Sequence, residues 1–233
     1  MARRSARVAP AAREGEPPPA AARPAFYALR SGGWRDFVTL LHVPYTAWHL
    51  SYVAIGAAVA PAVDIQRLAA TLTGFFLGVG LTAHALDELN GRPLRTKISD
   101  RTLWAIAVVG LAAAVALGVA GAAHVSWWLV AFVAFGGFIV LAYNLELFGG
   151  LFHSDLWFAV SWGAFPALTA SFAQTATITP DAVLVALACL FLSAAQRRLS
   201  TPVRQLRRRI ASVEGRMVFR DGTEAAVDET AIR

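Results

Sequence analysis

The stretch TAHALDELNGRPLRTKIS (residues 82–99) marks a sharp boundary between a long apolar run and a charged segment. The run that leads into it, residues 68–86, contains no charged side chain. About 20 predominantly apolar residues are enough to cross the roughly 30 Å hydrocarbon core of a bilayer as a helix. The boundary therefore predicts a transmembrane helix that ends at a charged loop.

Five further apolar blocks flank this helix. Lys and Arg are absent from residues 38–60, 103–123, 125–145 and 156–173, and a weaker block at 182–199 carries only Arg197 and Arg198 near its end. The composition agrees, because 57% of the residues are hydrophobic, 15% are charged and the mean hydropathy is +0.53. These values are typical of a membrane protein and not of a soluble domain. Residues 35–200 are therefore predicted to form an all-α transmembrane domain, a bundle of six helices.

Basic residues predict the orientation of this bundle. If both termini are cytoplasmic, every one of the 21 Lys and Arg residues except Arg67 falls on the cytoplasmic side. Such a bias is the usual signal of membrane topology. We therefore expect a multi-pass protein of the cell membrane with its N- and C-termini in the cytoplasm. Because topology explains the net charge of +6, no nucleic-acid partner is expected.

Two segments outside the bundle have distinct compositions. Residues 1–34 are rich in Ala, Pro and Arg in their first part and are predicted to be a disordered cytoplasmic tail. In residues 201–233, Thr201 followed by Pro202 is typical of a helix start, so a separate basic amphipathic helix is expected on the cytoplasmic leaflet. An Asp-Gly pair at residues 221–222 then predicts a β-hairpin in the short cytoplasmic tail.

Acidic and histidine side chains gather at the predicted cytoplasmic ends of two helices. A carboxylate at the C-terminal end of a helix opposes the helix dipole, at a cost of roughly 0.3–1 kcal/mol, so an oppositely charged partner is expected there. A divalent cation held by carboxylates is one such partner. The candidate metal ligands are His84, Asp87, Glu88, Glu146, His153 and Asp155.

Two other interpretations of these carboxylates stay open. Pairing with the basic residues that follow, Arg92, Arg95 and Lys97, would neutralise them at the membrane surface without any metal. A mixed set of histidine and carboxylate ligands would instead suit Zn, Fe or Mn better than Mg. In the first block, His42 and His49 share a helix face, and each is expected to donate a hydrogen bond to a backbone carbonyl. The alternative is that either ring points into the same cavity as the candidate ligands.

The segment HALDELNGRPLRTKIS resembles the first aspartate-rich motif of the UbiA superfamily of intramembrane prenyltransferases. In that motif, acidic residues after the second helix precede Arg-Pro-Leu and then Ile-Ser, which here stand at residues 92–94 and 98–99. Asp87 and Glu88 occupy the place of the metal-binding acids. Tyr143 and the WGAFPAL segment are also similar to that family, and the resemblance covers roughly residues 35–200.

The resemblance implies a UbiA-like bundle with a central cavity open toward the cytoplasm. In such an enzyme, Mg²⁺ binds a prenyl diphosphate and the prenyl group passes to an acceptor. The residues that would contact the substrate are Asn90, Arg92, Arg95, Lys97, Tyr143 and Asn144. The alternative is a UbiA-like membrane protein without catalysis, which binds a lipid or a partner. A homo-oligomer could close the cavity in either case.

Overall fold

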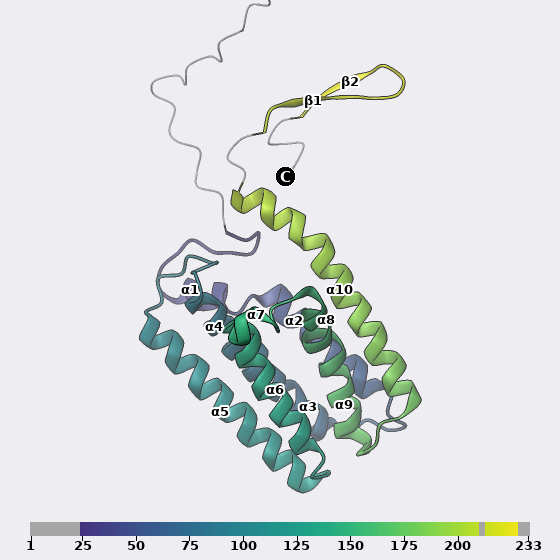
Figure 1. The fold of residues 1–233 in the computed structure, drawn as a ribbon. Coiled ribbons are helices and arrows are strands. Elements are labelled where there is room, and N and C mark those ends of the chain that lie inside the picture. Colours follow the sequence, from purple (N-terminus) through teal and green to yellow (C-terminus); the bar gives the residue numbers. More distant parts are fainter. Residues whose placement is uncertain (1–23, 210–212, 228–233) are drawn as a thin grey trace, which may run out of the picture.

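The computed structural model describes residues 24–209 and 213–227 as a helical bundle followed by a two-stranded hairpin (Figure 1). Residues 1–23 of the predicted disordered tail lie outside the described residues. Residues 24–33 are held against the first helix, because Leu29 N donates to Thr39 Oγ1 at 3.0 Å. Residues 24–33 belong to the predicted disordered tail of residues 1–34, and in the structure this part of it contacts the first helix.

The first apolar block forms two helices and not one. Helix α1 covers Trp34–Leu40 and α2 covers Val43–Ala58. They meet at His42, whose φ of 45° lies in the left-handed region and breaks the helical path. With 16 residues, α2 is about 24 Å long, which is shorter than the hydrocarbon core.

The second block forms one continuous helical rod from Ile65–Leu89. Its parts are α3 (Ile65–Phe75), the π-helix η1 (Phe76–Ala83) and α4 (His84–Leu89). The third block forms α5 (Asp100–His124), which encloses the predicted residues 103–123. Ser99 caps the N-terminus of α5, because its side chain accepts a hydrogen bond from Thr102 N at 3.2 Å.

The last three blocks also form helices, with bounds that differ from those predicted. The fourth forms α6 (Leu129–Asn144), followed by a short α7 (Leu147–Gly150). The fifth contains α8 (Asp155–Ala159), the π-helix η2 (Val160–Ala164) and α9 (Phe165–Thr175). The sixth is α10 (Pro180–Arg209).

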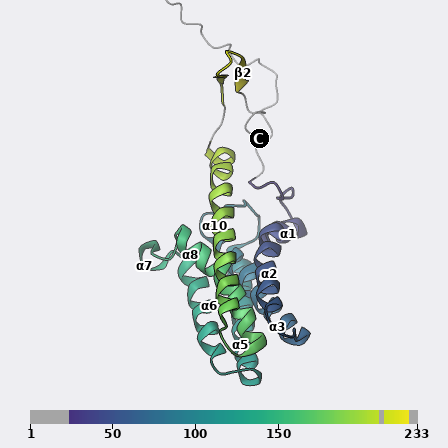
Figure 2. The same ribbon diagram turned by 90° about the vertical axis from the view of Figure 1, so that its right-hand side faces the viewer.

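Helix α10 runs through the position where a second helix was predicted to start. Pro202 lies inside α10, so the predicted start at Thr201 is wrong. The Thr201 hydroxyl, expected to cap a new helix, donates instead to Arg197 O at 2.8 Å, one turn back in the same helix. Figures 1 and 2 show α10 extending beyond the other helices as a single rod.

Four helices in the described part of the chain are long and apolar enough to cross a membrane. They are Ile65–Leu89, Asp100–His124, Asp155–Thr175 and Pro180–Gln205. Leu129–Asn144 is a shorter apolar helix. The architecture is thus that of an all-α membrane protein, and all six predicted apolar blocks contain helix.

The predicted hairpin is confirmed. Strands β1 (Gly215–Val218) and β2 (Glu224–Val227) pair antiparallel, with Gly215 opposite Val227 and Val218 opposite Glu224. Gly222, from the Asp-Gly pair, has a φ of 83°, a backbone angle that residues other than glycine rarely adopt.

The bundle has two ends that we name by their residues. The proximal end comprises the loop 90–99, the segment 145–154 and the adjoining turns of α10, whereas the distal end comprises the loops 59–64, 125–128 and 176–179. At the distal end, Arg67 Nη1 donates to Gln174 O at 2.9 Å, and the Gln174 amide oxygen accepts from Asp64 N at 2.7 Å. These bonds hold the start of α3 against the end of α9.

Close backbone contacts join α2 to α9 and η2 to α10. A Cβ atom on Gly56 would collide with the backbone of Ala167, and one on Gly163 would lie 2.6 Å from Cys189 O. Small residues that allow helix backbones to approach are the usual means of packing in membrane bundles. These two glycines therefore determine how closely the helices lie.

Gly56→Ala is expected to destabilise the bundle, because the added methyl would meet the backbone of Ala167, which cannot rotate away. Overpacking typically costs roughly 1–3 kcal/mol, so the midpoint of thermal unfolding in detergent should fall. Gly121→Ala is the control, because no neighbouring heavy atom lies within 4 Å of a Cβ there. Equal midpoints for the two variants would contradict the close contact between α2 and α9.

Candidate functional site

The fully buried carboxylate of Glu88 organises the proximal loop. Its Oε2 accepts a hydrogen bond from Leu94 N at 2.9 Å, and its Oε1 accepts from Thr96 N at 2.8 Å and Thr96 Oγ1 at 2.9 Å. Hydrogen bonds to an ionised acceptor are stronger than those between neutral groups. Both oxygens of this predicted metal ligand are therefore engaged in shaping residues 90–99.

Asp36 of α1 supports the same loop from the other side. This buried carboxylate accepts from Gly32 N and from Lys97 N, both at 2.9 Å. Asp36 was not among the predicted site residues. Its only signal was an acidic side chain beside an apolar block, which is also common at exposed helix starts.

The three basic residues of the loop differ in their surroundings. Arg92 Nη1 donates to Ile98 O at 2.6 Å, and its Nη2 pairs with Asp100. Arg95 and Lys97 are exposed. Arg92 and Arg95 have φ values of 53° and 55°, a conformation that non-glycine residues adopt only when their surroundings impose it.

Asn90 connects the loop after α4 to the segment after α6. Its Nδ2 lies 3.5 Å from Asn144 O and 3.3 Å from Glu146 Oε1. The amide of Asn144 is engaged within its own helix, donating to Val140 O at 2.7 Å. The structure thus brings the two predicted acidic groups to the same end of the bundle, with an amide between them.

His153 is held against the end of α6. Its ring stacks on Tyr143 at a centroid distance of 4.5 Å, and its Nδ1 lies 3.0 Å from Tyr143 O and 3.9 Å from Glu146 Oε1. Because a carbonyl oxygen can only accept, Nδ1 is the donor of the shorter contact. Glu146 and His153 therefore form one pair beside Asn90.

Asp155 belongs to a different pair. Its Oδ1 lies 2.7 Å from Arg197 Nε of α10, and the Arg197 guanidinium stands 4.7 Å from the ring centre of Phe158. The Asp155 carboxylate is therefore held by α10 through Oδ1.

The predicted metal ligands do not converge into one group. Within residues 24–209 and 213–227, no three His, Cys, Asp or Glu side chains are placed to hold a metal ion together. Glu88 binds its loop, Asp155 binds Arg197, and Glu146 lies beside His153. Helix-end position could not reveal these separate partners.

His84 lies deeper in the bundle than the charged residues. It is buried and stacks on His42 at a centroid distance of 4.3 Å, with its Nδ1 3.2 Å from Gly80 O. His42 Nδ1 lies 2.8 Å from the Tyr27 hydroxyl, so its partner at this nitrogen is a side chain and not the expected backbone carbonyl. The buried His49 ring lies among aromatic rings, including that of Trp162.

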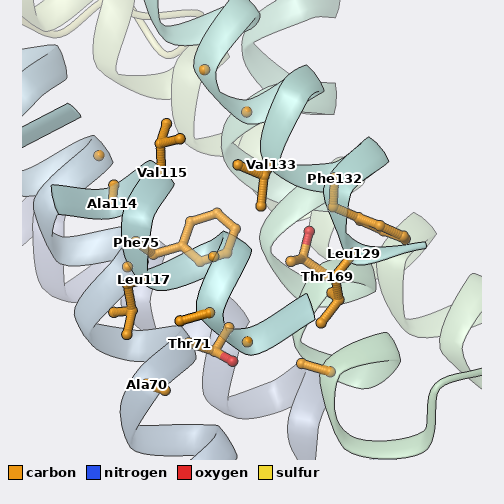
Figure 3. A pocket seen from close by; sticks show the side chains of 18 of the residues that line it. Ala70, Thr71, Phe75, Ala114, Val115, Leu117, Leu129, Phe132, Val133 and Thr169 are labelled. Carbon is orange, nitrogen blue, oxygen red and sulfur yellow. The ribbon is translucent and has the colours of Figure 1, made fainter. Parts of the chain in front are cut away.

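A cavity of about 530 Å³ lies between α3, α5, α6 and α9 (Figure 3). Its distal part is lined by Asp64, Arg67 and His124, and it reaches inward to Val140 and Trp162. Aliphatic and aromatic side chains and glycines form most of the wall. The resemblance implied a cavity open toward the proximal, cytoplasmic end, whereas this cavity runs from the distal end of the bundle past its middle to Val140 and Trp162.

Glu88→Ala is expected to loosen the loop 90–99, because three hydrogen-bond donors lose their acceptor. Unsatisfied buried groups cost about 1–3 kcal/mol each. Trypsin should therefore cleave faster after the exposed Arg95 or Lys97, as followed by mass spectrometry of the fragments. Glu146→Ala, which removes a more exposed carboxylate, should change the cleavage rate less. A loop equally resistant in Glu88→Ala and the unaltered protein would contradict this role.

The likeness of residues 82–99 to the UbiA motif is carried by the motif residues alone. No protein-family model, curated protein or solved structure matches the chain. Prenyl transfer and Mg²⁺ binding therefore remain predictions, and the geometry of the described residues decides which function is proposed.

Proposed function

We propose that this protein is a multi-pass membrane protein that binds a lipid-like molecule, with the apolar chain of that molecule in the cavity between α3, α5, α6 and α9. The observation that carries the proposal is the cavity itself. Its volume of about 530 Å³ lies within the range of roughly 300–1,000 Å³ that is usual for ligand pockets. A wall of mainly apolar groups favours an apolar ligand.

Glycines give the cavity its width. Gly74 and Gly78 of the second block, Gly121 of α5 and Gly137 of α6 all line it, and a Cβ at any of the four would have no contact closer than 4.0 Å. The space beside these glycines is therefore not needed for helix packing. The cavity therefore has room for a ligand beside these glycines, which supports a binding role.

The proposed orientation places the distal end outside the cell and the proximal end in the cytoplasm. It rests on the distribution of Lys and Arg, of which only Arg67 lies at the distal end. Trp127 and Trp128 are 68% and 75% exposed at that end, as expected for side chains at a membrane interface. In this arrangement all six helical blocks cross the membrane and both termini are cytoplasmic.

A second candidate function is UbiA-like prenyl transfer at the proximal end. One observation favours it: Asn90 joins the helix end that carries Asp87 to the segment that carries Glu146. Arg95 and Lys97 are exposed nearby in the sequence and could bind a diphosphate. We rank this function second, because the carboxylates Glu88 and Asp155 already have protein partners.

Gly137→Leu tests lipid binding. Its side chain would occupy the cavity, because Gly137 lines it and a Cβ there would have only Val115 Cγ2 nearby, at 4.0 Å. We expect binding of radiolabelled hexadecanoate to the purified protein to fall by about tenfold or more, equivalent to roughly 1.4 kcal/mol or more. Gly137→Ala should bind nearly as well as the unaltered protein. Equal binding by the Leu and Ala variants would refute the proposal.

Asp87→Ala tests prenyl transfer. If Asp87 holds Mg²⁺ for a diphosphate, the purified protein should bind the metal and release diphosphate from a radiolabelled prenyl diphosphate in the presence of an acceptor. The variant should lose both properties. Thermal unfolding of the two proteins serves as the control for folding. Equal metal content in both proteins, or none in either, would exclude Asp87 as a metal ligand.

A further inference from the structure

The polar residues that line the cavity are unevenly placed along it. Asp64, Gln66, Arg67 and His124 line its distal part, whereas Trp162 and other apolar side chains line its inner part. A ligand in this cavity therefore meets charged side chains at the distal end only.

The two hydroxyl groups between these ends add no polar site. Thr71 Oγ1 donates to Arg67 O and Thr169 Oγ1 donates to Phe165 O, both at 2.7 Å. Each hydroxyl hydrogen is thus used within its own helix, an arrangement that commonly satisfies Thr side chains in apolar surroundings. The section between the distal part of the cavity, which we call its mouth, and Trp162 consequently suits a hydrocarbon chain. Phe75, Leu117 and Phe132 line the cavity together with the two threonines (Figure 3).

Arg67 is the fixed cation of the mouth. Its Nη1 donates to Gln174 O at 2.9 Å and lies 3.4 Å from Ala173 O, and its Nε lies 3.5 Å from Asp64 Oδ2. Three contacts hold the guanidinium in place before any ligand arrives. Its remaining nitrogen, Nη2, makes no hydrogen bond to the described residues.

The neighbouring carboxylate does not oppose an anion as strongly as its charge suggests. Asp64 Oδ1 accepts from Gln66 N at 2.9 Å and from Arg67 N at 3.1 Å, because Asp64 caps α3, and Oδ2 faces Arg67. Its charge is thereby balanced by the start of the helix and by the guanidinium. The donors left at the mouth are Arg67 Nη2, the Gln66 amide and the His124 ring.

We infer that the cavity binds a single-chain amphiphile with an acidic head, such as a fatty acid, with the head at Arg67 and the chain directed inward to Trp162. This inference rests on the proposed lipid-binding function and adds the class and direction of the ligand. The exposed Trp127 and Trp128 put the mouth at the membrane interface. At the membrane interface the acidic head group stays close to water, while the hydrocarbon chain is removed from water.

The direction of the chain can be measured by fluorescence quenching in the full-length protein. Hexadecanoates that carry a nitroxide beside the carboxyl group or beside the terminal methyl group are added separately, and Trp162→Phe provides the background from the other tryptophans. The part of the quenching that depends on Trp162 should be larger with the terminal label. Stronger quenching by the label beside the carboxyl group would overturn the inference.

The head group is tested by comparing hexadecanoate with hexadecanol. Arg67→Gln should weaken binding of the acid by about tenfold, as expected for the loss of one charge-assisted hydrogen bond, and leave binding of the alcohol nearly unchanged. Gln174→Ala is the matched control, because it breaks a bond to Asp64 N in the same region but keeps the Arg67 charge. It should preserve the preference for the acid.

The outcomes separate this inference from the function on which it rests. Two outcomes would refute the role of Arg67 while binding itself persists. In the first, Arg67→Gln weakens binding of the acid and of the alcohol equally. In the second, Gln174→Ala loses the preference for the acid as much as Arg67→Gln does. If the unaltered protein binds neither hexadecanoate nor hexadecanol, the lipid-binding function fails, and the inference fails with it.

Discussion

The proximal end of the bundle depends on the burial of one carboxylate. Glu88 accepts hydrogen bonds from Leu94 N and from both donors of Thr96, so the chain after α4 must fold back over the helix end. That path brings Lys97 N to Asp36 of α1. It also delivers the chain to the start of α5. A buried charge is costly unless its hydrogen-bonding capacity is met, and the loop exists in this form because it meets that capacity.

Within the bundle, a π-helical segment adapts the second block to α5. The Thr82 hydroxyl lies 2.9 Å from Leu77 O and 3.3 Å from Ala107 O, so it is shared between η1 and the neighbouring helix. Gly110 makes this possible, because a Cβ there would lie 2.7 Å from Thr82 Oγ1. Irregular helix at membrane depth needs such substitute partners for its freed carbonyls. The Thr82 hydroxyl is such a partner, and the absence of a side chain at Gly110 lets the two helices stay closely packed beside it.

Much of the fold could be predicted from the sequence, because an apolar block of sufficient length has few alternatives in a membrane. The block at 103–123, for example, lies wholly inside α5. The break at His42 and the continuation of α10 through Pro202 were missed, since local residue preferences are weak against tertiary contacts. Helix geometry alone could not reveal either feature.

The candidate site was predictable in place but not in its contacts. Carboxylates at helix ends need partners. This rule correctly indicated that polar networks lie at the proximal end. It could not name those partners, because Glu88 binds backbone donors, which every residue except proline has, and Asp155 binds Arg197, which is distant in the sequence. The place and lining of the cavity were not predicted for a related reason. Glycines such as Gly78 and Gly137 enclose space only when their helices are placed side by side.

Trp162 explains why lipid binding is the better supported function. Its ring lines the inner part of the cavity and lies 5.7 Å, centroid to centroid, from Tyr143, which belongs to the proximal network. The apolar cavity and the proximal charges are thus separate regions that meet at an aromatic side chain. This separation of the apolar cavity from the proximal charges is the reason that we propose lipid binding before prenyl transfer.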